Sequence, residues 1–230
     1  MNVKRTKAEQ SELTQGALLK AARELFTEKG YAATATEEIV QRAGVTRGAL
    51  YHHFRDKEEL FEAVFAAAER ELVEKVRAAI GSAQLGPWEG LSVGCQAFLD
   101  ACLEPTVQRI ILLDAPSVLG WEAWCRIDAE YGLGLVRQGL QAAVDTGHID
   151  PLPVEPLAHM LLGALNEGAM FIARAENLPS ARAEVGAVVD RLLRGLTAAK
   201  LRQRRAGREA HTAQRTKKSS ERGGGRPADL

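Results

Sequence analysis

Residues 36–57 read TEEIVQRAGVTRGALYHHFRDK and combine two short helical patterns with a glycine between them. The apolar residues of the first half share one helical face, and Gly44 ends that helix because glycine is the usual residue beyond a helix C-terminus. Thr46 is a typical N-cap for a second helix, in which Leu50 and Phe54 share a face. Two short helices joined by a turn of three or four residues that contains glycine are typical of a helix-turn-helix, whose second helix enters the major groove of DNA.

The second helix would present a defined set of side chains to DNA. With Leu50 and Phe54 packed inward, a rotation of about 100° per residue directs Gly48 and His52 to the opposite side. Arg47 stands at the helix N-terminus, where its guanidinium can pair with O6 and N7 of guanine. Phosphate contacts are expected from Thr46, Tyr51, His52 and, at the start of the next helix, Lys57, while Gly48 and Ala49 let the backbone approach the DNA.

Helical spacing of apolar residues recurs along nearly the whole chain, and no alternating run of β-branched residues is long enough to predict a strand. We therefore expect an all-α fold, with a three-helix helix-turn-helix DNA-binding domain followed by a helical-bundle regulatory and dimerisation domain. The DNA-binding domain is expected over residues 12–72, with its helix-turn-helix at about 35–54, and the ligand-binding and dimerisation domain over 73–200. Helices are predicted at about 13–29, 57–80, 88–103, 105–114, 121–146, 156–176 and 181–200, with the two short helices of the helix-turn-helix between the first two of these.

The last two predicted helices carry broad apolar faces. Two such helices commonly close a hydrophobic core, and they can also pair with their copies across a two-fold axis. Both interpretations are open at this point, and the second predicts a homodimer through these two helices.

The net charge of zero conceals an uneven distribution of charge. The 230-residue chain has 30 Lys and Arg residues and 30 Asp and Glu residues, but the net charge is +1 over residues 1–60, −8 over 61–199 and +7 over 200–230. Residues 201–230 are rich in Arg, Lys, Ser and Gly and nearly free of apolar residues, so they are predicted to form a disordered basic tail. The tail would either add nonspecific DNA affinity through counterion release or act as a solubilising segment.

Targeting and redox signals are weak in this sequence. Residues 1–12 lack the apolar core of a signal peptide, and the apolar stretch 157–173 is interrupted by polar residues and too short to span a membrane. We therefore expect a cytoplasmic protein without membrane contact. The three cysteines, Cys95, Cys102 and Cys125, include no CxxC pair and are predicted to be buried free thiols.

Residues 18–60 (LLKAARELFTEKGYAATATEEIVQRAGVTRGALYHHFRDKEEL) resemble the DNA-binding domain of TetR-type transcriptional regulators, including the Phe54, Lys57 and Leu60 signature after the third helix. In weaker form, residues 108–121 (QRIILLDAPSVLGW) and the long helix after them resemble the regulatory domain of an actinobacterial branch of that family. The resemblance implies a homodimer that binds double-stranded operator DNA with palindromic half-sites, a pocket for a small-molecule effector in the C-terminal domain, and loss of DNA affinity when that ligand binds.

The resemblance also assigns individual residues. The family's DNA contacts carry over to Thr36, Arg47, Gly48, Ala49, Tyr51, His52, His53 and Lys57. Ala35 departs from the family, in which Ser or Thr often occupies this position at the start of the second helix.

Polar residues inside otherwise apolar helices are candidate ligand contacts, because a buried polar group needs a partner that a ligand can supply. These candidates are Arg109, Asp114, His159, Asn166 and Glu167, and the large apolar candidates are Phe98, Trp121, Trp124 and Met170. Each has an alternative interpretation, either as a core residue or as one half of a pair within the protein.

Other function classes find little support in the sequence. Motifs such as G-x-S-x-G, the P-loop and H-E-x-x-H are absent, so we expect neither an enzyme nor a cofactor. His52 and His53 are adjacent and would diverge by about 100° on a helix, so no metal site is expected there. The remaining alternative to a ligand-responsive repressor is a helical interaction module without sequence-specific DNA binding.

Overall fold

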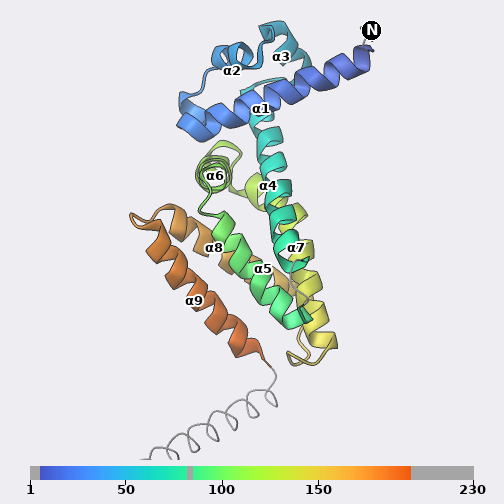
Figure 1. Ribbon diagram of the computed structural model, residues 1–230, viewed down its shortest axis with the longest axis vertical. Coiled ribbons are helices and arrows are strands. Elements are labelled where there is room, and N and C mark those ends of the chain that lie inside the picture. Colours follow the sequence, from blue (N-terminus) through green and yellow to red (C-terminus); the bar gives the residue numbers. More distant parts are fainter. Residues whose placement is uncertain (1–5, 82–84, 198–230) are drawn as a thin grey trace, which may run out of the picture.

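The computed structural model describes residues 6–81 and 85–197, and it confirms the all-α fold (Figure 1). The basic tail predicted over 201–230, and the end of the helix predicted over 181–200, lie outside the described residues. The elements are α1 (Lys7–Ala33), α2 (Thr36–Ala43), α3 (Arg47–His53), α4 (Lys57–Gly81), α5 (Pro87–Ala101), the π-helix η1 (Val107–Asp114), α6 (Ala115–Val118), α7 (Trp121–Asp145), α8 (Val154–Ala173) and α9 (Leu178–Leu196). None of the described helices is long and apolar enough to cross a membrane.

Helices α1, α2 and α3 form a head at one end of the molecule, and α4 runs from this head into the body (Figure 1). Apolar residues of all four helices meet in one core, with Phe26, Ile39, Leu50 and Phe61 fully buried. Phe26 and Phe61 pack edge to face with ring centroids 5.2 Å apart. Helices of seven or eight residues are not stable by themselves. The shared core therefore holds the two short helices, α2 and α3, against α1 and α4.

The starts of α2 and α4 depend on carboxylate side chains. A capping box from Thr34 to Glu37 is expected from spacing, but the Thr34 hydroxyl donates to the Gly30 carbonyl at 2.7 Å instead. The α2 start is held by Glu38, which accepts the Ala35 N–H at 2.9 Å. At the start of α4, Asp56 accepts the N–H of the residue three positions on at 2.8 Å, as its spacing predicts.

The head and the body share their core. The cluster that begins in α1 continues through α4 into η1, α7 and α8, where it includes Ile110, Trp124 and Met170. A second cluster joins α5, α7, α8 and α9 around Leu99, Leu140 and Leu165. The domain boundary expected at residue 72 falls inside the continuous helix α4, so the two halves are coupled mechanically through that helix.

The helix expected over 105–114 is a π-helix over 107–114 and not an α-helix. Its wider turn is seen at Ala115, whose N–H donates to the Ile110 carbonyl five residues earlier. Pro116 follows immediately and has no N–H to donate to an α-helical partner, which favours such a change of helix type. The chain then continues through α6 and turns at Gly120, which has a positive φ of 81°.

Candidate functional site

The turn between α2 and α3 has the geometry expected from the sequence. Gly44 adopts a left-handed conformation (φ 66°, ψ 30°), and the Val45 N–H donates to the Val40 carbonyl at 3.0 Å, which closes the C-terminus of α2. The Thr46 hydroxyl then accepts the Ala49 N–H at 3.2 Å and caps α3. These local contacts set the angle between the two helices and thereby the direction in which α3 presents its outer face.

The outer face of α3 is exposed as the helical rotation predicts. Leu50 is fully buried and Phe54 nearly so, whereas Arg47, Gly48, Tyr51 and His52 are exposed. Thr46 is exposed as well, while Thr36, Ala49, His53 and Lys57 are half-buried. All nine residues assigned to DNA contact therefore belong to the stretch from the start of α2 to the start of α4, and none is enclosed in the core.

Arg47 is held in place by its neighbours in the DNA-free protein. Its Nη1 atom lies 2.9 Å from Oε1 of Glu37, and its guanidinium lies 5.5 Å from the centroid of the Tyr51 ring. The Glu37 carboxylate is anchored by the Thr36 hydroxyl at 3.1 Å, and hydrogen bonds from its own backbone N–H and from Thr36 lower its pKa. A phosphate or a guanine edge would have to replace Glu37 as the partner of this guanidinium.

Lys57 is engaged within the head. Its Nζ atom donates to the carbonyls of Tyr31 and Thr34 at 3.0 Å each and lies 4.1 Å from the centroid of the Tyr31 ring. The ammonium therefore closes the C-terminal end of α1, which leaves one N–H for a phosphate. Arg42, at the end of α2, is engaged as well, because its guanidinium donates to the Glu28 carboxylate at 2.9 Å.

A polar junction connects the end of α1 to η1. Oδ2 of Asp114 accepts the Tyr31 N–H at 2.7 Å and the Arg109 Nε–H at 3.2 Å. The Arg109 guanidinium lies against Gly30, where a Cβ atom would collide with it and where φ is 82°. Arg109 and Asp114 are therefore contacts between the head and the body.

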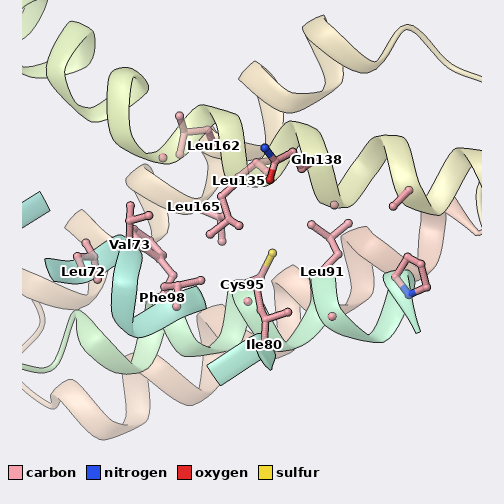
Figure 2. Close-up of a pocket in the computed structure, with 18 of the residues that line it drawn as sticks. Leu72, Val73, Ile80, Leu91, Cys95, Phe98, Leu135, Gln138, Leu162 and Leu165 are labelled. Atoms are coloured by element: carbon pink, nitrogen blue, oxygen red, sulfur yellow. The ribbon is translucent and has the colours of Figure 1, made fainter. Parts of the chain in front are cut away.

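A cavity of about 370 Å³ lies in the body between α4, α5, α7 and α8. Figure 2 shows Leu91 and Cys95 on one wall, with Leu135 and Leu165 on the facing wall. The lining is mostly apolar or glycine: Leu72, Val73, Val76, Ile80, Leu85, Gly86, Pro87, Gly90, Leu91, Gly94, Cys95, Phe98, Gly132, Leu135, Val136, Gly139, Ala142, Leu162 and Leu165. Its three strongly polar side chains are Glu69, Asp128 and Gln138.

Two carboxyl groups are buried together beside this cavity. Oδ2 of Asp128 accepts a hydrogen bond from the Asn166 amide at 2.6 Å, and Oε1 of Glu69 is buried without a hydrogen-bond partner. Burial raises the pKa of Asp128 to about 6. Burial, together with the charge of Asp128, raises the pKa of Glu69 well above its ordinary value.

Most of the ligand candidates chosen from sequence lie outside this cavity. Phe98 lines it, and Asn166 adjoins it through Asp128. Trp124 and Met170 are buried in the core, with the Trp124 indole donating to the Ile111 carbonyl at 2.9 Å. Arg109 and Asp114 form the junction with the head. Trp121, His159 and Glu167 are exposed, and His159 pairs with Glu155 at 3.7 Å.

Glu69 and Asp128 are not among the ligand contacts predicted from the sequence, although helical periodicity places both on buried faces. Glu69 lies four residues after Phe65 and three before Leu72, both buried in α4. Asp128 lies four residues after Trp124 on the buried face of α7. An acidic residue in register with a buried apolar face is the signal that would have found both.

Two of the three cysteines are buried, as predicted from the sequence. Cys95 and Cys102 are buried free thiols, while Cys125 is half-buried. Burial raises the pKa of the Cys95 thiol to about 12, so this thiol stays protonated beside the cavity. The described residues contain no group of three or more His, Cys, Asp or Glu side chains that could hold a metal ion.

Comparison with known proteins agrees with this architecture. Residues 18–64 match the family model of bacterial regulatory proteins of the tetR family, and residues 88–196 match that of the tetracyclin repressor-like C-terminal domain. The Tn10 TetC protein of Escherichia coli is 27% identical over 71% of this chain and 82% of that protein. The transcriptional repressor BepR of Brucella suis is 46% identical over 29% of this chain and 31% of that protein.

A solved structure extends the similarity to nearly the full length of a relative. The crystal structure of a TetR-family transcriptional regulator from Pectobacterium atrosepticum has a TM-score of 0.75 and 35% identity, over 84% of this chain and 98% of that chain. The helix-turn-helix geometry, the two family matches and this structural relative lead to one conclusion. The chain belongs to the TetR family of transcriptional regulators, which bind DNA through the N-terminal helix-turn-helix and carry a ligand-binding C-terminal domain.

Proposed function

We propose that the protein is a homodimeric repressor that binds a palindromic operator in the cytoplasm and is released when a small molecule enters the α4–α5–α7–α8 cavity. The observation that carries the proposal is the continuity of α4. One end of this helix contacts the head through Lys57, and its other end lines the cavity from Glu69 to Ile80. A ligand that changes the position of α4 therefore changes the position of α3.

The DNA-reading part of the proposal depends on Arg47. It stands at the N-terminus of α3, its side chain is 64% exposed, and its acidic partner Glu37 is equally accessible. An exposed ion pair of this kind contributes little stability, so exchanging Glu37 for a DNA acceptor costs little. Because the head has nearly balanced charge, its affinity should depend on docking geometry more than on long-range attraction.

The dimer is supported by an apolar surface on the last two helices. Met160 and Phe171 on α8 and Val188 and Leu192 on α9 are each more than half exposed, whereas the opposite faces of both helices are buried. Met160 and Phe171 lie three helical turns apart, so they share one face. In Figure 1, α9 lies at the outer edge of the body, where a second copy can pack against it.

The junction between η1 and α1 supplies a second route from cavity to head. Asp114 holds the last turn of α1 through the Tyr31 N–H, and η1 packs against both α1 and α4. A dimer would hold two α3 helices about 34–36 Å apart for successive major grooves, and a changed spacing would no longer fit them.

The DNA-binding proposal is tested by selecting genomic fragments that bind the purified full chain and measuring their affinity by fluorescence anisotropy. We expect the selected fragments to share an inverted repeat. Arg47→Ala should weaken binding by about 10- to 100-fold, since one bidentate base contact is worth about 1–3 kcal/mol. Arg126→Ala is the matched control, because Arg126 is equally exposed but lies on α7. Equal binding by both variants would refute the assignment of the reading surface.

The dimer proposal is tested by sedimentation. Val188→Glu places a charge in the proposed interface and should convert the dimer to a monomer. Leu13→Glu is the control, because Leu13 is a half-exposed apolar residue on α1, far along the chain from α8 and α9. A dimer that persists in Val188→Glu would contradict the proposed interface.

The alternative function is a helical interaction module without sequence-specific DNA binding. The same selection separates the two functions, because such a module would retain genomic fragments without any shared sequence.

A further inference from the structure

The cavity holds an unpaired carboxyl group in an otherwise apolar wall. Oε1 of Glu69 has no hydrogen-bond partner among the described residues, and the residue is only 2% exposed. Burial of a carboxyl oxygen without a hydrogen-bond partner is unfavourable, and a donor on a bound ligand would relieve this cost. Glu69 lines the cavity, and a ligand in the cavity can therefore reach this oxygen.

A second carboxyl group lines the same cavity from another helix. Asp128 on α7 lines the same space that Glu69 lines from α4, and the Asn166 amide on α8 is the only donor to it among the residues that the structure describes. One donor leaves most of the acceptor capacity of the two carboxyl groups unused. No Lys, Arg or His is among the described residues that line the cavity, so these lining residues supply no positive charge.

The remaining walls define the rest of the ligand. Leucine, valine and isoleucine side chains surround the space, and Figure 2 shows Leu162 and Leu165 on one side with Ile80 and Phe98 on the other. The cavity volume of about 370 Å³ is at the low end of the range of about 300–1,000 Å³ for ligand pockets. A compact molecule with a bulky apolar body and one polar end fits this description.

The charge of the pair indicates one positive charge on the ligand. Burial raises the pKa of Asp128 to about 6, and burial with the charge of Asp128 raises the pKa of Glu69 further from its ordinary range. Two carboxyl groups that interact in a low-dielectric site do not both ionise readily. Near neutral pH the pair therefore carries close to one negative charge, which a single ammonium group balances.

We infer that the effector is a lipophilic monocation, an amine or amidine whose charged end lies between Glu69 and Asp128 and whose apolar body fills the leucine-lined cavity. The inference rests on the proposed function, since it names the class of ligand that the regulatory cavity takes. Asn166 is a positioning residue in this site, because it orients the Asp128 carboxylate and does not itself line the cavity.

The test compares three probes of nearly equal shape on the DNA-free full chain by calorimetry at neutral pH. They are 3,3-diphenylpropylamine (a cation), 3,3-diphenylpropanol (neutral) and 3,3-diphenylpropionate (an anion). We expect the amine to bind about 10- to 100-fold more tightly than the alcohol, as for a charged hydrogen bond made in a buried site. The anion should bind more weakly than both, because it meets carboxyl groups.

Two isosteric variants identify the groups responsible. Glu69→Gln and Asp128→Asn should each lower the affinity for the amine by about tenfold or more while changing the affinity for the alcohol by less than about threefold. Glu130→Gln is the control, because Glu130 lies on the exposed side of α7 and is not part of the lining. Equal loss of affinity for the amine and the alcohol in both variants, with the fold intact by circular dichroism, would overturn the assignment of the charge contact to this carboxyl pair.

The outcomes separate this inference from the proposed function. Equal or tighter binding of the alcohol would overturn the inference, because the carboxyl pair would then act as a neutral hydrogen-bonding group. Amine binding that depends on Glu69 and Asp128 but leaves the operator complex unaffected would support the cation site in the cavity and would contradict the proposed release by ligand. Release of the operator by the alcohol but not by the amine would overturn the inference, while the proposed function as a ligand-released repressor would stand.

Discussion

Asp128→Asn should make the protein more stable at neutral and alkaline pH. Asp128 is 6% exposed, and burial raises its pKa from 3.8 to about 6. A shift of this size corresponds to about 3 kcal/mol at about 1.36 kcal/mol per pKa unit. The folded state therefore favours the protonated acid. The stabilisation that the folded state gains from protonated Asp128 is fully present below the unfolded-state pKa of 3.8, and it is lost as the pH rises through the folded-state pKa of about 6. Asparagine keeps the hydrogen bond to Asn166 without the buried charge.

The measurement is urea unfolding of wild type and variant at pH 8 and near pH 3, followed by circular dichroism at equal protomer concentration. At pH 8 the variant should be more stable by about 3 kcal/mol, or about 6–12 °C in Tm for a protein of this size. The difference should become small near pH 3, where Asp128 is mostly protonated in both the folded and the unfolded state because even its ordinary pKa of 3.8 lies above that pH. Glu130→Gln, an exposed change on the same helix, should show no such pattern. A variant no more stable than wild type at pH 8, or a difference independent of pH, would refute the argument.

Three further substitutions test the contacts that position the two sites. Thr46→Ala removes the hydroxyl that caps α3 and should cost about 1 kcal/mol of stability in urea unfolding and weaken operator binding. Trp124→Phe removes the buried donor to the Ile111 carbonyl and should cost about 2–3 kcal/mol in the same assay, whereas an unchanged midpoint would contradict the importance of this bond. Asp114→Ala leaves the Tyr31 N–H without its acceptor and should lower the free energy of unfolding by about 1–3 kcal/mol. The proposed coupling also predicts that ligand then changes the DNA affinity of this variant less than that of wild type, as measured by fluorescence anisotropy.

The head could be predicted from sequence almost residue by residue. Its information is local, because Gly44, Thr46 and the spacing of Leu50 and Phe54 act within a few residues of one another. Turn chemistry and helical rotation then decide which side chains face outward. The one local error, the Thr34 capping box, arose because two neighbouring residues can both start α2, and contacts with α1 decide between them.

The ligand cavity could not be predicted in the same way. Its walls come from α4, α5, α7 and α8, and the register in which these helices pack is absent from any single segment. A polar residue within an apolar helix can face a cavity, a domain junction or solvent, and Asp128, Asp114 and His159 show these three outcomes.

The helical class, the helix-turn-helix and its outer face follow from the order of the residues, because 100° of rotation per residue and a left-handed glycine are properties of a short chain segment. The pairing of Glu69 with Asp128, the engagement of Lys57 with the end of α1 and the place of Arg109 at the junction depend on tertiary packing. Each of these brings together residues at least 23 positions apart. Their side chains meet only after the helices have packed, and burial then determines which charges are paired and which remain for a ligand.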